Sequence, residues 1–546
     1  MTKESSWYGG LESTAASEAD IIVREFRDVR GIEIGGVSDP EDPGYRDRDV
    51  TPNGIAFMYA QDHILTREQY LGDAGGVQEV QGATRPRGVL DILRENGFQD
   101  RDIRVSRVVR DVVLIRLNGD RRKDTRESNE EARESSDSTT ESDEENLKGN
   151  DRPSGGGGGT GEGNGEIAEG DQPDVIFLLN RIDEELGVGI ATPDQVLTAA
   201  NGSLSPCSAT EPQPVYPPVE LNPARCAGNG GARVRIFLAD TGLLPDAAEK
   251  FDWLHGVDGE KDLRTGAGGT IVPYEGHGTF VAGVLRCVAP EAEVYVANIF
   301  NTAGSALESD FVLRLNAAFG FGFEILHLTA SCMTRKNVQL IALEAWLEQL
   351  QSYKGVVCIA PAGNNHTRRP SWPGALPGVI SVGALAADLH SRAQFSDYGS
   401  WVNVYAPGEN LINAFASGTY TCEIPPFVGQ QRTFSGRALW SGTSFSAPIV
   451  TGLIAARMAR RGESGKEAVA ALLDRARAQT IPGVGPVLLP CCDDEDGNCG
   501  GHDCGGCVDC GCGRGDCDGC GGHGHRSRGH CGCGRCGHDK PGGRRW

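Results

Sequence analysis

Between residues 231 and 477 the chain alternates short apolar segments with stretches of helical periodicity, and this alternation constrains the fold more than any other feature of the sequence. Short buried runs separated by helices are typical of a parallel sheet covered by helices. The length of the segment suits one α/β domain. The expected strands are Val234–Ala239, Val294–Ile299, Ile325–Thr329, Val356–Ala360 and Val379–Val382, and the clearest helix is Val338–Tyr353.

Three segments of this domain carry the residue types that acyl-transfer chemistry needs. Asp240 ends an apolar strand, His277 opens a helix of small residues, and Ser444 opens an apolar helix. Serine is a weak nucleophile until a base removes its proton, and histidine suits that task because its pKa lies near neutrality. A buried carboxylate fixes the imidazole tautomer and stabilises the imidazolium. The three residues therefore predict a nucleophile, its base and an orienting acid.

A fourth segment, Ala-Pro-Ala-Gly-Asn-Asn, places Asn364 just past the end of an expected strand. A side-chain amide in that place is a candidate donor to a developing oxyanion. The helix that begins at Ser444 also aims backbone N–H groups at the same charge. We therefore expect Asn364 and the backbone at Ser444 to form an oxyanion hole.

The segments around Asp240, His277, Asn364 and Ser444 together resemble the four signatures of the subtilisin-like (subtilase) serine peptidases. The order Asp, His, Ser also matches that family and differs from the chymotrypsin and α/β-hydrolase orders. The resemblance implies that Asp240, His277 and Ser444 form the catalytic triad and that Asn364 donates to the oxyanion. It further implies an α/β fold, a three-layer sandwich with a central parallel sheet, in which peptide substrates lie extended along the cleft and no cofactor takes part in catalysis.

The segment after the third expected strand departs from the pattern of the family. Subtilisin-like peptidases usually have a Ser-Leu-Gly-like segment there, which forms one wall of the S1 pocket, whereas this chain has Thr329, Ala330, Ser331 and Cys332. Strand pairing with a substrate needs only backbone groups. We therefore expect Thr329, Ala330, Ser331 and Gly363 to contact the substrate, in a pocket whose shape departs from that of the family. The family's calcium sites lie in irregular loops, and the sequence does not locate them.

Composition divides the rest of the 546-residue chain, which is too long for one ordinary domain. Residues 121–173 are acidic, rich in Gly and Ser and almost without apolar residues, so they predict a disordered linker. After Leu489 the chain is dominated by Gly, Cys, Asp and His. We expect an N-terminal region (1–120), this linker (121–173), a second part of the N-terminal region with a connector (174–230), a subtilisin-like domain (231–482) and a tail rich in Cys, Gly and His (483–546).

Ordered segments are expected on both sides of the linker. Gly54–Ala60, Val108–Leu117 and Val175–Leu179 have the composition of strands, and Arg87–Glu95 has helical spacing. Subtilisin-like enzymes often carry an N-terminal propeptide that assists folding and inhibits the site. We hypothesise that residues 54–120 and 174–200 form such a unit, interrupted by the linker, and act as an intramolecular inhibitor. The alternative is a domain that recognises a substrate or a partner.

The cysteines are unevenly distributed. Six of the 18 are scattered, and the remaining twelve crowd between Cys491 and Cys536. In a chain without a visible signal peptide, such a cluster indicates metal ligands before disulfides. Thiolates with this spacing suit zinc or another soft transition metal. The candidate ligands are Cys504, Cys507, Cys510, Cys517, Cys520, Cys533 and Cys536. The alternative is a Gly-rich disordered tail with incidental thiols.

Charge and hydropathy exclude some classes of partner. The formal net charge of −23 argues against a nucleic-acid partner. We see neither a targeting segment nor an apolar run long enough to span a membrane, so we expect a cytoplasmic protein without a membrane partner.

The expected function is that of a serine endopeptidase, which hydrolyses peptide bonds in a protein or peptide substrate through an acyl-enzyme. Two alternatives stay open. One is a transpeptidase or peptide cyclase that transfers the acyl group to an amine. The other is a metal-responsive regulatory binding protein whose protease fold is silent.

Overall fold

The computed structural model describes residues 18–37, 57–72, 87–118, 173–199, 209–216, 233–262, 269–353, 355–423, 427–490 and 544–545. The described residues form two compact units. The first unit takes its residues from 1–60, 108–112 and 194–546, and the second from 61–107 and 113–193. The expected linker, apart from residue 173, and all the candidate metal-binding cysteines lie outside the described residues.

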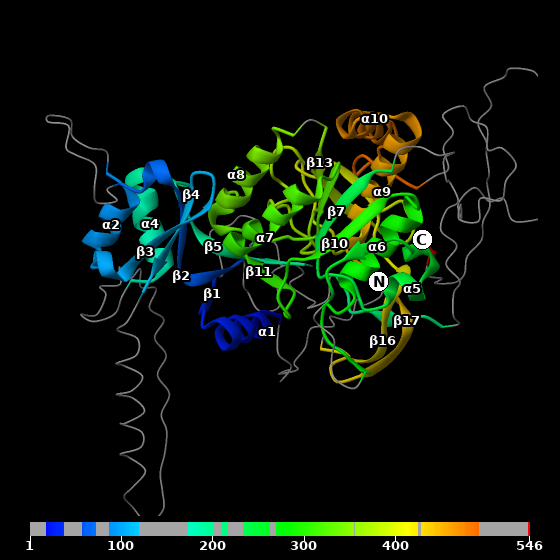
Figure 1. The fold of residues 1–546 in the computed structure, drawn as a ribbon, viewed down its shortest axis with the longest axis horizontal. Coiled ribbons are helices and arrows are strands. Elements are labelled where there is room, and N and C mark those ends of the chain that lie inside the picture. Colours follow the sequence, from blue (N-terminus) through cyan, green and yellow to red (C-terminus); the bar gives the residue numbers. More distant parts are fainter. Residues whose placement is uncertain are drawn as a thin grey trace, which may run out of the picture. The chain divides into compact units, whose positions relative to one another are not determined.

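The first unit is built on a seven-stranded sheet of the order β15-β14-β13-β12-β7-β10-β8 (Figure 1). All neighbouring strands in it are parallel, so the predicted parallel sheet is confirmed. The strands are β7 (Arg235–Asp240), β8 (Asp258–Gly259), β10 (Glu293–Asn298), β12 (Ile325–Leu328), β13 (Val357–Pro361), β14 (Val379–Leu385) and β15 (Val404–Pro407).

Helices cover both faces of this sheet, as Figure 1 shows. Ile236 and Leu238 of β7 belong to the same core cluster as residues of α6 (His277–Val288), α9 (Thr443–Arg461) and α10 (Gly465–Ala478). Phe237 lies between them in the strand and contacts Phe321, with ring centroids 6.1 Å apart. Because successive side chains of a strand point to opposite faces, β7 supports both layers.

The second helical layer consists of α7 (Glu308–Phe321), which contains Phe321, and α8 (Ile341–Leu350). The predicted helix at Val338–Tyr353 is therefore confirmed, with shorter ends. The short α1 (Glu18–Glu25) and α5 (Ala247–Lys250) also belong to the first unit.

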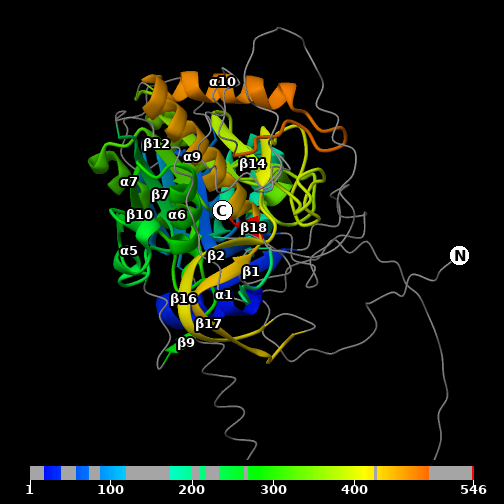
Figure 2. The same cartoon turned by 90° about the vertical axis from the view of Figure 1, so that its right-hand side faces the viewer.

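A second sheet of the first unit is organised around a long hairpin of β16 (Leu411–Thr421) and β17 (Gln431–Trp440), drawn in yellow in Figure 2. The other edge of β17 pairs with β6 (Gln213–Pro214) in antiparallel fashion. β9 (Thr270–Ile271) and β18 (Arg544–Arg545) pair with β16 in parallel. The strand β6 therefore adds a segment that precedes the predicted subtilisin-like domain to a sheet of that domain.

The second unit contains most of the N-terminal region. Its sheet has the order β5-β2-β4-β3, formed by β2 (Phe57–Arg67), β3 (Ile103–Val109), β4 (Val112–Leu117) and β5 (Ala191–Thr198). Its helices are α2 (Val89–Glu95) and α4 (Val175–Leu186), and α2 confirms the helix predicted at Arg87–Glu95. The strand predicted at Gly54–Ala60 corresponds to β2.

Two strands, β2 and β5, continue into the first unit. There β2 pairs with β1 (Ile34–Val37) and β5 with β11 (Ser305–Leu307), both antiparallel.

Two expectations for this region were wrong. Val175–Leu179 begins the helix α4, not a strand, because Leu178, Leu179 and Ile182 together form one buried helical face. The segment Val108–Leu117 is not one strand. It holds the end of β3 and all of β4, separated by a turn at Arg110, whose φ is 47°.

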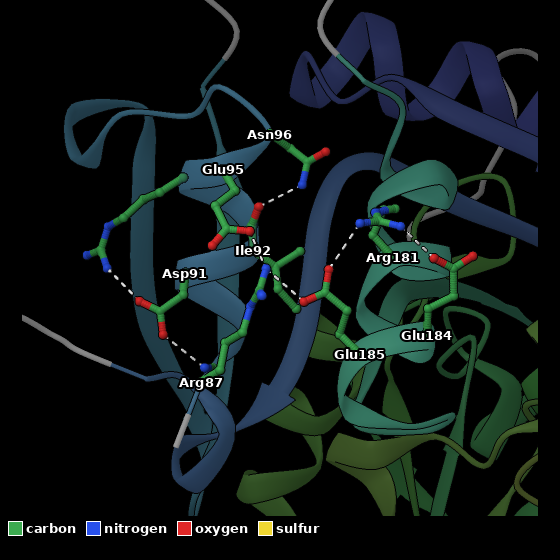
Figure 3. Close-up of polar contacts among 10 residues, drawn as sticks. Arg87, Asp91, Ile92, Glu95, Asn96, Arg181, Glu184 and Glu185 are labelled. Carbon is green, nitrogen blue, oxygen red and sulfur yellow. Dashed lines mark hydrogen bonds and ion pairs between the residues drawn. The ribbon is translucent and has the colours of Figure 1, made fainter. Parts of the chain in front are cut away.

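Ion pairs connect α2 and α4 on the surface of the second unit. The side chain of Arg87, just ahead of α2, contacts Glu185 of α4 at 2.7 Å, and Arg181 contacts Glu184 and Glu185 at 2.7 and 3.2 Å (Figure 3). The Asp91 carboxylate accepts the N–H of Gly88 at 2.9 Å and so closes the first turn of α2. Exposed pairs of this kind contribute little to stability, so the buried faces of the helices hold the unit together.

Within the described part of the chain, no helix combines the length and the apolar character that a membrane crossing needs.

Candidate active site

Asp240 and His277 meet at the carboxyl edge of the parallel sheet. Asp240 is the last residue of β7, and His277 is the first residue of α6. Both side chains are completely buried, and His277 Nδ1 lies 2.8 Å from Asp240 Oδ1. Burial raises the pKa of Asp240, but the charge of His277, its hydrogen bond and the N–H of Thr241 outweigh it, and the net shift is downward. The carboxylate therefore stays charged and can orient the imidazole ring.

Glycine at position 278 allows α6 to begin so close to β7. A Cβ at Gly278 would lie 2.4 Å from the carbonyl oxygen of Gly242, so any larger residue would push the helix away from the strand end. The Gly278 N–H also donates to Thr241 Oγ1 at 2.9 Å. These two contacts fix the start of the helix, and with it His277, against the end of β7.

Aromatic side chains hold the ring of His277 in place. The ring centroids of Trp440 and Phe445 lie 5.6 and 5.4 Å from that of His277. The Nε2 atom of His277 is buried and has no hydrogen-bond partner among the described residues. The nitrogen that does not face Asp240 is therefore available to take a proton from a neighbouring group.

Ser444 lies in the first turn of α9 and is 1% exposed. Its Oγ donates to the carbonyl oxygen of Ala199 at 3.3 Å. Asn364 is tied to the same helix start, because its Oδ1 accepts both the N–H and the Oγ1 hydroxyl of Thr443 at 2.9 Å. The Oδ1 atom of Asn364 thus faces Thr443, and these two bonds do not use the Nδ2 group, which is the hydrogen-bond donor of the side chain.

The loop that carries Asn364 rests on a buried carboxylate that the sequence analysis did not single out. Asp397 Oδ1 accepts the N–H groups of Asn365 and Thr367 at 2.8 and 3.0 Å. Gly363, with φ of 107°, allows this approach, since a Cβ there would lie 2.3 Å from Asp397 Oδ2. Burial raises the pKa of Asp397 to about 7 in spite of these bonds. Asp397 therefore shapes the loop that presents Asn364.

This pKa predicts how Asp397 affects stability. The folded protein holds the Asp397 proton up to a pH of about 7, whereas the unfolded chain releases it near its ordinary pKa of 3.8. Unfolding between these pH values releases a proton, so stability falls as the pH rises through this window. Asp397→Asn keeps the shape and cannot ionise. Relative to this variant, the wild type should lose free energy of unfolding from pH 4 to pH 7, which denaturant titration would measure.

Asp388 provides a control of opposite sign. Burial raises the pKa of Asp388, but the hydrogen bonds from His390 and Ser391 together outweigh it, and the net shift is downward. Asp388→Asn should therefore be less stable than the wild type at neutral pH. This difference in stability should disappear as the pH falls below the ordinary pKa of a carboxyl group, because Asp388 then becomes protonated in the wild type. An identical pH dependence for wild type and Asp397→Asn would contradict the assignment of the raised pKa.

The segment expected to contact substrate is paired with the chain itself. Ser331 exchanges two backbone hydrogen bonds with Thr198, at 2.9 and 3.1 Å. The N–H of Ala199 donates to the carbonyl of Gly304 at 2.8 Å. Thr329 faces the other way, since its hydroxyl donates to the carbonyl of Ala239 at 2.7 Å. The end of β5 thus runs between two backbone segments toward Ser444.

The other predicted wall residues lie close by. Ala330 is completely buried after β12, and Cys332 exchanges two backbone bonds with Trp372 at 2.8 Å each. Gly363 donates its N–H to Thr443 Oγ1 at 3.1 Å, so it lies beside the start of α9.

The side chain of Asp194 attaches β5 to the start of a helix. Asp194 accepts the N–H of Ser309 at 3.0 Å and its hydroxyl at 2.6 Å, and so caps α7. Glu308, which precedes Ser309 in α7, accepts the N–H groups of Ala342 and Leu343 at the start of α8. Burial and the charge of Asp194 raise the pKa of Glu308 to about 8. Asp194 and Glu308 thus connect β5 to the starts of α7 and α8 through hydrogen bonds.

Sequence reasoning missed Ala199, Asp194 and Asp397. Ala199 has no side-chain chemistry that could mark it. Asp194 lies in the polar strand Ala-Thr-Pro-Asp-Gln-Val-Leu-Thr, whose residues are all buried and show no alternation. Asp397 acts on a loop 32 residues away in sequence, so no local pattern connects them.

Comparison with known proteins identifies the domain that contains these residues. The model of the Subtilase family matches residues 231–485. This domain is a subtilase. The resemblance that the sequence motifs predicted is therefore confirmed, for a segment that makes up less than half of the chain. The central parallel sheet and the helical layers on both of its faces agree with that family.

Curated relatives are similar over the same part. The chain is 26% identical to M-protease of Shouchella clausii over 253 residues, which cover 43% of this chain and 57% of the relative. It is 30% identical to the thermophilic serine proteinase of a Bacillus species over 205 residues, or 35% and 44% of the two chains. It is 26% identical to Subtilisin Savinase of Lederbergia lenta, over 43% of this chain and 80% of the relative. The chain thus covers about half of the first two relatives.

The described cysteines of the subtilase domain are poor candidates for a nucleophile. Cys287, Cys332, Cys358 and Cys422 are free and buried, as expected of small apolar residues. Burial raises the pKa of Cys287 to about 12. The thiolate, which is the reactive form, is therefore disfavoured.

The metal prediction for the C-terminal tail stays a prediction, because its cysteines lie outside the described residues. Among the residues that the structure does describe, no group of three or more His, Cys, Asp or Glu is arranged to hold a metal ion.

Proposed function

We propose that the protein is a serine endopeptidase that hydrolyses peptide bonds through an acyl-enzyme. The observation that carries the proposal is the buried contact of 2.8 Å between Asp240 and His277 in a subtilase domain. A charged carboxylate on Nδ1 leaves the opposite nitrogen, Nε2, as the proton acceptor. The same residues would serve a transpeptidase, and hydrolysis is preferred because it needs no second substrate besides water.

In the proposed mechanism His277 Nε2 takes the proton of Ser444 Oγ as the oxygen attacks the carbonyl carbon of the substrate. The negative charge that develops on the carbonyl oxygen is stabilised by the Asn364 amide and the N–H groups at the start of α9. His277 then gives its proton to the leaving amine, which frees the carboxyl-side product. Water, activated by His277 in the same way, hydrolyses the ester and restores Ser444.

We further propose that the chain inhibits itself through β5. Thr198 and Ala199 pair with Ser331 and Gly304 as an extended substrate would, and the carbonyl of Ala199 lies at Ser444 Oγ. This arrangement supports the propeptide hypothesis over a separate recognition domain. Release of β5 from the site would require cleavage of the chain between Ala199 and Ala209, the next described residue. The N-terminus of the processed protein should therefore lie between these two residues.

A fluorophosphonate probe tests the proposed function. Protein that has lost its N-terminal region should be labelled at Ser444, and intact protein should be labelled more slowly because β5 covers the site. Ser444→Ala should not be labelled in either form. Absence of labelling before and after removal of the N-terminal region would refute the peptidase proposal and favour a silent fold. Product masses separate the two enzyme classes, since hydrolysis adds water and transfer to an amine does not.

Substitution of Asn364 tests the oxyanion hole. Asn364→Asp keeps an oxygen that can accept from Thr443 but replaces the amide donor with a second oxygen. We expect kcat to fall by about 10² to 10³ while KM changes little, because the lost bond forms only as the oxyanion develops. Steady-state kinetics on a peptide anilide would measure both constants. A change confined to KM would mean that Asn364 binds the substrate and does not stabilise the transition state.

A further inference from the structure

A second piece of the chain is hydrogen-bonded to the residues just before Ser444. This piece, residues 209–216, is called the rim segment below. Its first residue, Ala209, donates its N–H to the carbonyl of Ser441 at 3.2 Å, three residues before the nucleophile. The carbonyl of Thr210 accepts the indole N–H of Trp440 at 2.7 Å. Farther along, β6 pairs with β17 through Gln213 and Pro214.

A buried carboxylate anchors the rim segment. Glu211 is 6% exposed, and its Oε1 accepts the Tyr420 hydroxyl at 2.9 Å and the N–H of Glu423 at 2.6 Å. The guanidinium of Arg432 lies 4.0 Å from its Oε2 and donates to the carbonyl of Pro212 at 2.9 Å. A buried carboxylate costs free energy unless hydrogen bonds and positive charge surround it. Here they do, so the segment is strongly attached to β16 and β17.

These attachments do not involve β5. The contacts of the rim segment described above reach Ser441, Trp440, Tyr420, Glu423 and Arg432, all of which belong to the β16–β17 hairpin or flank it. Cleavage of the chain between Ala199 and Ala209 would therefore leave the rim segment in place. It also covers backbone groups of β17 that would otherwise form an open sheet edge.

The direction of β5 shows which half of a substrate the rim segment displaces. Leu197, Thr198 and Ala199 approach Ser444 in chain order, with β5 antiparallel to β11. A substrate that follows this path places the residues before its scissile bond along β11 and Ser331. The residues after the scissile bond, which leave with the amine, continue beyond Ser444, and the carbonyl of Ser441, three residues before it, is already bonded to Ala209.

We propose that the rim segment stays bound after processing and limits the leaving-group side of the cleft, so that the preferred substrates are peptides cleaved close to their carboxyl ends. This inference rests on the proposed peptidase function and adds a substrate class to it. Glu211 and the N–H of Ala209 determine this specificity from outside the catalytic machinery.

The test compares two substrates in processed protein. Both begin with Val-Leu-Thr-Ala, the sequence of residues 196–199, so that the carbonyl of Ala199 precedes the bond to be cleaved. One ends there as a p-nitroanilide, and the other continues with the seven residues of 200–206. The wild type should have a higher kcat/KM for the anilide, beyond any difference in leaving-group reactivity that subtilisin shows with the same pair.

Two variants should release the rim segment by different routes. Glu211→Ala removes the anchor, and Ala209→Pro removes the N–H that binds Ser441. In each, kcat/KM for the extended peptide should rise by roughly tenfold, the effect of losing one to two hydrogen bonds to a charged or buried group, while anilide hydrolysis stays unchanged. Glu249→Ala, at an exposed position of α5, is the matched control and should change neither value.

The outcomes separate the two proposals. If the wild type cleaves both substrates as subtilisin does, or if both variants leave the ratio of kcat/KM values unchanged, the rim segment does not restrict the cleft and the inference is wrong. If processed wild type hydrolyses neither substrate, the peptidase function itself fails and the inference falls with it. Because the two variants act on different contacts, misfolding of one does not remove the test.

Discussion

Ser444→Ala is expected to lower kcat for peptide hydrolysis by about 10⁶-fold, the loss that removal of the triad serine causes in subtilisin. The reason is that Ser444 Oγ supplies the bond of the acyl-enzyme in the proposed mechanism, whereas the hydroxyl of the neighbouring Thr443 is already bonded to Asn364 Oδ1. Because Ala occupies the position with little change in volume, folding should be preserved. The same variant should keep its N-terminal region attached, since processing would need the same hydroxyl.

Ser446→Ala is the matched control for this experiment. Ser446 lies two residues farther along α9 and is equally buried, so its substitution tests the cost of losing a hydroxyl in this helix. It should leave kcat within a few-fold of the wild type. Near-ultraviolet circular dichroism of both variants would verify folding. A residual rate in Ser444→Ala within about a hundredfold of the wild type would show that another group is the nucleophile.

Asp240→Asn should lower kcat by about 10⁴-fold and leave KM almost unchanged. The amide keeps the size of the carboxylate but carries no charge, so it no longer stabilises the imidazolium and favours the wrong tautomer of His277. Burial should make the effect strong, since neither side chain is exposed. Single-turnover kinetics on an anilide substrate would separate the chemical step from binding.

The exposed Asp246, at the start of α5, offers a control for Asp240. Asp246→Asn changes the same charge by the same amount at the surface. It should leave the rate unchanged, because an exposed charge is screened by solvent and salt. If Asp240→Asn lost less than about tenfold, the contact with His277 would be structural and the proposed base would need another partner.

The candidate catalytic residues could be singled out from the sequence because each lies in a short local motif. His277 must begin a helix next to glycine, and Ser444 must open one, so both leave short motifs that can be recognised without the rest of the chain. Five of the seven strands of the parallel sheet were also recognisable, since burial on both faces makes them continuously apolar, whereas β8 and β15 were not predicted. Their ends agree with the structure to within a few residues.

Three other features could not be predicted from the sequence, and each has a physical reason. The five apolar residues Val175–Leu179 fit a strand or a buried helix equally, and only Ile182 in the next turn decides for the helix α4. The turn at Arg110 was missed because positive φ values usually occur at glycine or asparagine, and this position has an arginine. Contacts such as that of Glu211 with Tyr420 span 209 residues, so no local pattern could reveal them.

The way in which β5 is held has a consequence for which peptides fit the cleft. The N–H groups of Thr198 and Ala199 both donate, to Ser331 at 3.1 Å and to Gly304 at 2.8 Å. An imino acid has no such hydrogen, and its ring would meet the carbonyl in its place. A substrate that followed the path of β5 would therefore be selected by its main chain. A profile of cleaved peptides should be depleted of proline at these two positions, whatever residues surround them.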